Sequence, residues 1–447
     1  MTAANNPKVT WRTHYALTLL ALVYVMSYID RLVISVLIEP IKLEFGVSDT
    51  MMGLLTGVAF ALFYTAFGFP IGRLSDRIGR KPVIVVACIV WSILTMLSGI
   101  VTSFLWLAVL RIGVAMGEAG GSAPSIAMIS ELYPPRQRSR ALAVFGLGPA
   151  LGAVLGIGFG GVLAEMYGWR TTLIIVGAPG ILIGLTLALT VKAPRVTATA
   201  GSAPVESIVK TIRSLFHIPS FWQIVATGSA AAITGYAIQM WTPSFMIRSH
   251  QISIQEAGIL MGVGGGLTAI IGTLFCGYLT DKLAAKDPGW QLGTALLGTG
   301  LSIPLALAFY FWPAGTAFSI MSMSVPTGFL FYMGFAFFGV WWTIPCFGAL
   351  SQILPPNKMA QGTAIFFMGV TLIGAGLGPV VAGGISDLLT THIGAESLRY
   401  ALVAATCMLI VPCGFLVMAI PKYRKQINGN HNNDAKTSIA STRPATS

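Results

Sequence analysis

Four charged residues lie inside long apolar stretches of this chain. Asp30 and Arg31 are neighbours in the first stretch, and Arg111 and Glu118 lie in the fourth. A charge at the centre of a membrane helix costs about 2.5–3.5 kcal/mol on insertion scales. Two carboxylates and two guanidinium groups can pair, bind an anion or take up a proton. Their retention at that cost predicts a functional site, which the surrounding elements must position.

The composition predicts what those elements are. The chain has 447 residues, of which 55% are hydrophobic and 9% are charged, and its mean hydropathy is +0.78. Soluble domains are about 25% charged, so this is the composition of an all-α, multi-pass membrane protein. Apolar stretches of spanning length predict twelve transmembrane helices, at about 15–37, 51–71, 83–102, 104–126, 140–163, 171–191, 220–245, 256–278, 291–312, 325–350, 361–386 and 398–420.

The distribution of Lys and Arg predicts the orientation. If both termini are cytoplasmic, the cytoplasmic segments hold 21 of the 27 basic residues and the outer loops hold four. Cytoplasmic loops of membrane proteins are enriched in Lys and Arg, so we expect both termini in the cytoplasm. The net charge of +12 is largely this bias, together with attraction to anionic membrane lipid, and does not call for nucleic acid.

The positions of the cysteines and histidines argue against disulfide bonds and metal binding. All five cysteines fall in apolar stretches and the five histidines are scattered, so the sequence predicts no disulfide framework and no metal site. The chain also has no N-glycosylation sequon, and its outer loops are short. These features favour the inner membrane of a bacterium. We also expect a monomer.

An internal repeat divides the chain into two halves. "GLLTG" at 53–57 runs on to "GRLSDR" at 72–77, and "GILMG" at 258–262 runs on to "GYLTDK" at 277–282, with the same offset of 205 residues. We expect six-helix bundles at 1–191 and 217–421, a cytoplasmic linker at 192–216 and a disordered cytoplasmic tail at 422–447. Parallel six-helix repeats are the plan of major facilitator transporters, with the substrate site between the halves.

Three motifs strengthen that resemblance. "GRLSDRIGRK" (72–81) resembles the motif between the second and third helices of the major facilitator superfamily, "RIGVAMGEA" (111–119) its fourth-helix motif and "GPALGAVLG" (148–156) its fifth-helix motif. "YIDR" (28–31), "GEAGGSAP" (117–124), "LYPPRQRSRALAVF" (132–145) and "GLGPVVAGGISD" (376–387) most resemble the spinster lipid transporters. This resemblance implies alternating access and a proton-linked carrier of amphiphilic lipids, such as sphingosine 1-phosphate or lysolipids, driven by a proton gradient with no cofactor.

Helix geometry places the buried charges relative to one another. At 1.5 Å per residue, Asp30 lies about 22 Å above the cytoplasmic start of its helix, and Arg111 lies about 10 Å below the outer face. In a core about 30 Å thick the two reach the same level, and Glu118 lies two turns lower on the face of Arg111. One interpretation is a structural ion pair between Asp30 and Arg111. The other makes Asp30, Arg111 and Glu118 the proton-coupling groups, because burial favours a neutral carboxyl and a nearby arginine favours a charged one.

The substrate would meet a charged half and an aromatic half. Arg31 is about 100° around the helix from Asp30, and the family resemblance implies that it faces the cavity and binds the anionic group of the substrate. Snorkelling of Arg31 to the outer interface is the alternative. Besides Arg31 and Arg111, the candidate substrate-binding residues are Tyr236, Gln239, Trp241, Trp341 and Thr343, for which packing and lipid contact remain alternatives.

A separate group is predicted to gate the cycle. The family resemblance implies that Asp76, in the motif with Gly72, Arg77 and Arg80, holds the cytoplasmic ends of the two halves together in the outward-open state. The two arginines could equally be ordinary cytoplasmic basic residues.

Four kinds of function compete on this sequence. A proton-coupled carrier of anionic lipids leads, and a symporter of small organic anions such as sugar acids needs the same four charges; a drug exporter is a further alternative. A membrane enzyme or receptor is least supported. The chain lacks a phosphate-binding loop, a nucleophile elbow and a Cys/His cluster, so we expect neither an enzyme nor an ATP-driven pump.

Overall fold

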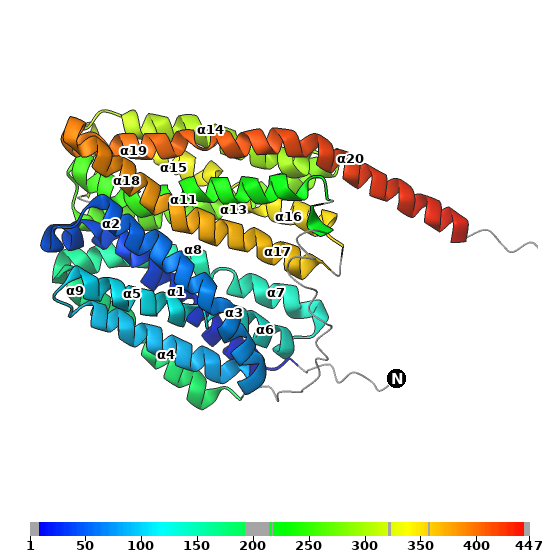
Figure 1. Ribbon diagram of the computed structural model, residues 1–447, viewed down its shortest axis with the longest axis horizontal. Helices are drawn as coiled ribbons and strands as arrows, with labels where there is room; N and C mark the ends of the chain where they lie inside the picture. The colour runs from blue at the N-terminus through cyan, green and yellow to red at the C-terminus, as the bar shows by residue number, and fades with distance from the viewer. Residues whose placement is uncertain (1–8, 193–213, 217, 321–322, 356–357, 442–447) are drawn as a thin grey trace, which may run out of the picture.

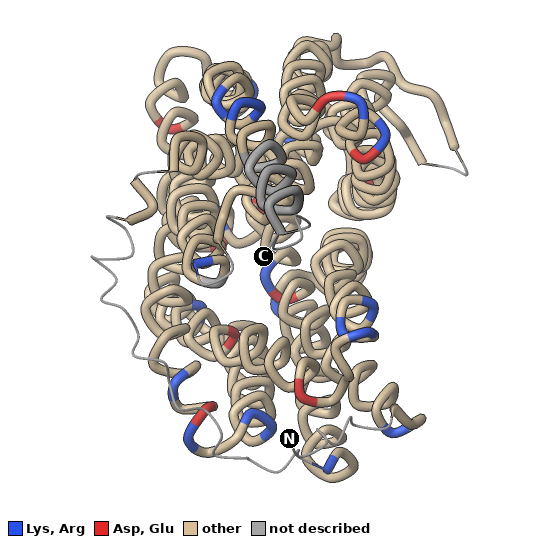
Figure 2. The backbone as a smooth tube through the Cα atoms, turned by 90° about the vertical axis from the view of Figure 1, so that its right-hand side faces the viewer, with Lys and Arg blue, Asp and Glu red and all other residues tan. Residues whose placement is uncertain are grey.

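The computed structural model describes residues 9–192, 214–216, 218–320, 323–355 and 358–441. Most of these residues are helical, and the helices run along the length of the molecule (Figure 1). We call the end at which α1 begins the terminal end, because the described chain also finishes there. The opposite end, at which α1 finishes, is the distal end. Figure 2 looks onto the terminal end and shows Lys and Arg segments around it.

The first half consists of helices and two π-helical turns, η1 and η2. In chain order they are α1 (Trp11–Phe45), α2 (Asp49–Leu54), η1 (Leu55–Ala59), α3 (Phe60–Ile78), α4 (Arg80–Ser98), α5 (Phe104–Glu118), α6 (Ser122–Leu132), α7 (Pro135–Phe145), α8 (Gly148–Ala153), η2 (Val154–Phe159) and α9 (Gly160–Thr190).

The second half repeats this pattern and adds a short antiparallel hairpin, in which Ala317 pairs with Pro326. Its elements are α11 (Phe221–His250), α12 (Ile254–Ile259), η3 (Leu260–Gly265), α13 (Gly266–Ala284), α14 (Trp290–Phe311), β1 (Ala317–Ile320), β2 (Met323–Pro326), α15 (Phe329–Gly339), α16 (Thr343–Ile353), α17 (Met359–Met368), η4 (Gly369–Ala375), α18 (Gly376–Ile393), the short η5 (Gly394–Glu396), α19 (Ser397–Cys407) and α20 (Ile410–Ser441).

Each of the twelve predicted apolar stretches lies largely within described helix. By length and composition, nine helical stretches of the described chain could cross a membrane. Two of them, Pro135–Thr190 and Gln361–Gly429, have 56 and 69 residues, far more than the roughly 20 that one crossing needs. The first bends at Gly168, whose φ of 77° suits glycine, and the second bends at η5. The number of crossings and the side of the termini remain predictions.

The C-terminal segment differs from the sequence-based expectation. The tail expected to be disordered from residue 422 continues α20 as helix to Ser441. The first turns of this extension pack on the second half, because Tyr423 is fully buried and its hydroxyl donates to Gln352 Oε1 at 2.6 Å. Most of the predicted linker at 192–216 lies outside the described residues.

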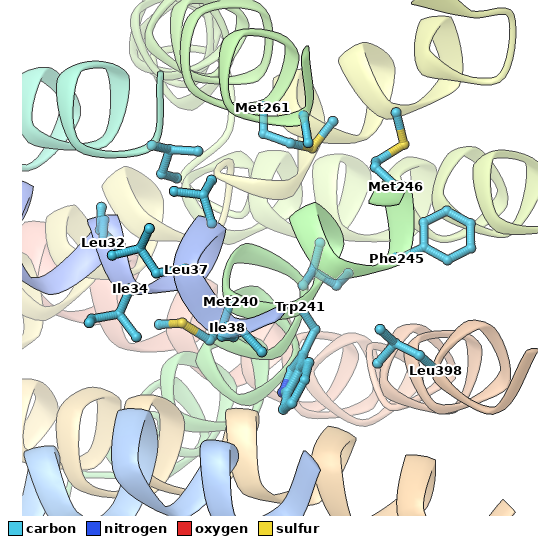
Figure 3. Packing of buried hydrophobic residues seen from close by; sticks show 14 of the residues in the cluster. Leu32, Ile34, Leu37, Ile38, Met240, Trp241, Phe245, Met246, Met261 and Leu398 are labelled. Carbon is cyan, nitrogen blue, oxygen red and sulfur yellow. The ribbon is translucent and has the colours of Figure 1, made fainter. Parts of the chain in front are cut away.

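Three hydrophobic cores show how the halves meet. One core, which includes Leu20, Ile84 and Leu187, belongs to the first half, and another, which includes Phe221 and Leu416, belongs to the second. The largest core is shared between the halves. Figure 3 shows part of it, with side chains of α1 beside side chains of α11. The shared core includes the distal part of α1 up to Ile41, so the halves pack together toward the distal end.

Candidate substrate and proton site

The buried charges form two ion pairs between α1 and α5. Arg111 Nη1 donates to Asp30 Oδ1 at 2.9 Å, and Arg111 Nη2 donates to the Asp30 backbone carbonyl at 3.2 Å. Thr95 of α4 donates to Asp30 Oδ2 at 2.5 Å. Both carboxylate oxygens of Asp30 therefore have partners from neighbouring helices. This first pair ties α1, α4 and α5 together.

The second pair uses the next residue of α1. Arg31 Nη2 donates to Glu118 Oε2 at 2.8 Å, and Ser27 donates to the same oxygen at 2.9 Å. Side chains of a helix lean toward its N-terminus, so Arg31 reaches toward the terminal end and meets Glu118 rather than Arg111. Asp30 and Arg31 are adjacent but point in different directions, so each pairs with a different residue of α5.

The two ion pairs differ in how many of their polar atoms have hydrogen-bond partners. Among the described residues, neither Arg31 Nε nor Glu118 Oε1 has a hydrogen-bond partner, although both atoms are buried. The Arg31 side chain is 13% exposed, whereas those of Arg111, Asp30 and Glu118 are 6%, 4% and 0% exposed. Arg31 is therefore the member of the quartet most open to a ligand.

Aromatic rings surround the Arg31 guanidinium group. Its central carbon lies 4.3 Å from the ring centre of Phe60, 4.9 Å from that of Tyr28 and 5.1 Å from that of Tyr64. Cation–π contacts of this kind hold a guanidinium group in place without using its hydrogen-bond donors. A small pocket that both Arg31 and Arg111 line has an accessible volume of about 10 Å³, enough for about one water molecule. The rings thus hold the guanidinium group, while Nε has no hydrogen-bond partner among the described residues.

The predicted residues of the second half occupy different surroundings. Tyr236 of α11 interacts electrostatically with Arg31 across the boundary between the halves. Trp241 and Trp341 are fully buried: the Trp241 indole donates to the Pro379 carbonyl at 2.8 Å, and Trp341 packs among Phe275, Phe337 and Phe338. Each tryptophan has a packing role here, and its role in substrate binding remains a prediction.

Gln239 and Thr343 are less enclosed than the two tryptophans. Gln239 of α11 is half-buried, and Thr343 at the start of α16 is exposed. The structure gives neither residue a contact with the charged quartet, so their roles in substrate binding also remain predictions for the described protein.

The predicted gating motif lies at the terminal end. Asp76 is 64% exposed and pairs with Arg80 Nη1 at 2.7 Å, while Arg80 Nε donates to Glu131 at 2.6 Å. These residues all belong to the first half. Arg77 is exposed, and Gly72 has open space beside it. The arrangement fits a tie that is not made in this conformation, and the gating role stays a prediction.

Several residues of the site escaped the sequence analysis. Ser27, Thr95, Phe60 and Tyr64 are ordinary helix residues, and no spacing rule singles them out. Ser27 could have been found, because it lies one turn before Asp30 and Arg31 on the same helix. The others come from helices α3 and α4, whose faces toward α1 are set by tertiary packing.

Most of the chain matches a known protein family. A family model described as Major Facilitator Superfamily matches residues 20–379. The chain belongs to the major facilitator superfamily. It is therefore a transporter, with several membrane-spanning helices, and not an enzyme.

Relatives within this superfamily are named for different functions. An "MFS-type efflux pump" of Mycolicibacterium smegmatis is 32% identical over 427 residues, covering 95% of each chain. "Protein spinster homolog 3" of Danio rerio is 27% identical over 408 residues, covering 85% of this chain and 78% of its own. The "D-galactonate transporter" of Escherichia coli is 26% identical over 313 residues, covering 65% of this chain and 72% of its own. The chain is thus related to spinster proteins and to sugar-acid transporters.

Solved structures agree with the spinster resemblance. A bacterial homologue of the human lysosomal transporter Spinster, in an inward-facing and unoccupied conformation, superposes with a TM-score of 0.82 at 29% identity, covering 94% of this chain and 99% of that one. The occupied, inward-facing form gives a TM-score of 0.81 at 28% identity over the same shares of the two chains.

Proposed function

We propose that this protein is a proton-coupled secondary transporter of anionic amphiphiles, such as lysolipids or sphingoid phosphates, that works by alternating access. It would act as a monomer in a bacterial inner membrane, with both termini in the cytoplasm and the proton gradient in place of a cofactor. The terminal end would then be the cytoplasmic end, and the conformation described here would face inward.

Arg31 is the observation that carries this proposal. Its guanidinium group is held by three aromatic rings, has no partner for Nε in the described part of the chain and is more exposed than the other three charges. Such a group suits a phosphate or carboxylate, since guanidinium groups donate to anions in a fixed fork. Aromatic and apolar side chains around it, including Phe60 and Tyr236, suit a ligand whose remainder is apolar.

The charge balance of the four buried residues would couple binding of the anion to uptake of a proton. Asp30, Arg31, Arg111 and Glu118 have a net charge of zero, so an anion brought to Arg31 leaves one negative charge in excess. Glu118 would lose its arginine partner and keep Ser27, in surroundings that favour a neutral carboxyl. Glu118 would therefore take up a proton as the anion binds, and both would cross together. Asp30 would mainly keep Arg111 in place.

Two alternatives keep specific support. The relationship to galactonate transporters favours a sugar-acid symporter, which would use Arg31 and Glu118 in the same way. The efflux-pump relative favours an exporter of drugs. A cationic drug would bind Glu118 directly and require its deprotonation, so protons would then move opposite to the substrate.

Affinity should rise with the length of the substrate tail if the substrate is an amphiphile. Each buried methylene contributes about 0.8 kcal/mol, so four more carbons would tighten binding about a hundredfold if all were buried. Partition of the tail into the bilayer reduces that gain, and we expect about tenfold. The measurement is competition against a fixed probe by lysophospholipids with one head group and increasing acyl chains.

A sugar-acid symporter would give the opposite pattern. Its affinity would depend on the carboxylate and hydroxyl groups, and long chains would be rejected. A flat or falling affinity along the acyl series, together with displacement of the probe by galactonate, would contradict the lipid proposal.

A further inference from the structure

A groove runs between α14 and α20 at the terminal end of the second half. Figure 1 shows these two helices side by side, on the side of the second half that faces away from the first. The groove has a volume of about 410 Å³, and small-molecule sites have about 300–1,000 Å³. Its lining comes from α14, α20 and the turn before α14, so it is separate from the buried charges of α1 and α5.

Two glycines of α14 leave the groove hollow. Gly289 and Gly293 are four residues apart, so they lie on the same face of the chain as it enters and follows the helix. A Cβ atom on Gly289 would lie 3.1 Å from Arg424 Nε, and one on Gly293 would lie 3.0 Å from Cε3 of Trp290. Larger side chains at these two positions would therefore occupy the groove.

The greater part of the lining is apolar and faces outward. Leu296 and Ile420 are half-buried in the groove, and Trp290 and Leu297 are exposed beside them. Trp290 is the first residue of α14, and tryptophan is enriched at the level of lipid head groups. Over the seven residues from Trp290 to Leu297 the helix rises about 10 Å. This strip suits part of an acyl chain that enters from the bilayer.

The terminal end of the groove is basic. Arg424 Nε donates to Asp287 Oδ1 at 2.8 Å, and Nη2 pairs with Asp287 Oδ2, so the edge that carries Nη1 is available to a further acceptor. The Arg424 side chain is still 52% exposed. Lys286 and Lys425 are exposed next to these two residues in the chain, which gives three bases and one acid. Basic pockets between membrane helices bind anionic lipid head groups.

We propose that this groove binds one phospholipid of the membrane that has an anionic head group. Its phosphate would contact the Nη1 edge of Arg424, and one acyl chain would lie along Gly293 and Leu297. A basic end, an interfacial tryptophan and an apolar strip follow one another along the groove, in the order of the parts of such a lipid. The lipid would belong to the cytoplasmic leaflet if the terminal end is cytoplasmic, as proposed above.

Native mass spectrometry of the full-length protein in detergent tests this site. Phosphatidylglycerol and phosphatidylcholine with the same acyl chains are the two probes, and the number of bound lipids and their affinity are measured by titration. We expect one phosphatidylglycerol to bind at least about tenfold more tightly than phosphatidylcholine, because the choline cation is repelled by the basic side chains.

Two variants separate a lipid site from a merely structural ion pair. Arg424→Gln and Asp287→Asn both break the pair, but they change the charge of the groove in opposite directions. Arg424→Gln should weaken phosphatidylglycerol binding about tenfold, since a charged donor is lost. Asp287→Asn should strengthen it severalfold, because Arg424 is released to the phosphate. Asparagine can still accept from the Gly289 amide, which Asp287 Oδ1 contacts at 3.0 Å.

A further variant tests the acyl part of the groove. Gly293→Leu fills the groove and should weaken phosphatidylglycerol binding about tenfold. Gly300→Leu is the matched control, because Gly300 lies in the same helix with open space beside it. Lys282→Gln removes an exposed base at the same end but outside the groove, and it should leave binding unchanged.

Three results would overturn the proposal. Equal binding of the two lipids would show that the head group is not recognised. Shifts in the same direction for Arg424→Gln and Asp287→Asn would show a structural pair. Loss of tight phosphatidylglycerol binding in the double variant Arg31→Ala with Glu118→Gln would place the lipid at the substrate site. The Arg424, Asp287 and Gly293 variants leave the buried charges intact, so their failure would not affect the proposed function.

Discussion

The Glu118→Gln variant should bind anionic lysolipids more tightly while losing all proton movement that accompanies them. Glutamine cannot take up the proton, so coupling is lost. It also releases Arg31 from a charged partner, so the anion no longer competes with a carboxylate. Hydrogen bonds to charged groups are worth about 1.5–3 kcal/mol, so affinity should rise about tenfold. Binding is measured by competition, and proton movement by a pH-sensitive dye inside proteoliposomes.

The matched control for this variant is Glu131→Gln. Glu131 also belongs to the chain segment of α5 and α6, but it is exposed and pairs with Arg80 at the terminal end. It should leave the affinity, and the number of protons moved with each substrate molecule, unchanged. Weaker binding in Glu118→Gln, or coupling that survives the substitution, would contradict the assignment of Glu118 as the proton carrier.

The Arg31→Ala variant should lose affinity for anionic substrates about thirtyfold or more. Truncating one partner of a desolvated charge pair costs about 2–5 kcal/mol. A neutral analogue with the same tail, such as a monoacylglycerol, does not use the guanidinium group and should be affected far less. The measurement compares the two ligands in the same competition assay.

This substitution also leaves Glu118 buried without its arginine, which destabilises the fold. The double variant Arg31→Ala with Glu118→Gln removes both charges and serves as the control for folding. It should remain folded and still discriminate poorly between anionic and neutral ligands. Equal losses for both ligands in the two variants would indicate a structural role for Arg31.

The helical plan and the level of the buried charges could be predicted from sequence because they follow from simple geometry. Hydropathy located the helices, and the rise of 1.5 Å per residue placed Asp30 and Arg111 at the same depth. In the structure these two side chains are in contact. The angle of about 100° between neighbours likewise separated Arg31 from Asp30.

The other residues of the site could not be predicted, because they depend on which face each helix turns toward its neighbours. The aromatic residues of the second half illustrate this limit, since Trp341 is packed between helices of its own half while Tyr236 lies near Arg31. Both belong to apolar helices rich in aromatic residues, and periodicity does not distinguish core from cavity there. Thr95 and Phe60 meet the charged pairs through tertiary packing alone.

The contacts between the halves at the distal end show a second limit. Arg248 of the second half pairs with Asp49 of the first, and Asp387 and Glu165 each accept from a backbone amide of the opposite half. Lys42 and Arg248 entered the sequence analysis only as two of the four basic residues of the outer loops. Their partners depend on how the two halves meet, and that differs between the conformations of a transporter. The repeat offset of 205 residues was visible, but not that Asp387 and Glu165 would bind the amides of the opposite half.

The most direct test of the central claim is proton movement driven by substrate in the unmodified protein. Purified protein is reconstituted into liposomes that contain a pH-sensitive dye, and either an anionic lysolipid or D-galactonate is added outside, with protein-free liposomes as the reference. The account predicts that the lysolipid acidifies the lumen in proportion to its uptake and that galactonate does not. Lysolipid uptake without acidification, or acidification by galactonate alone, would contradict it.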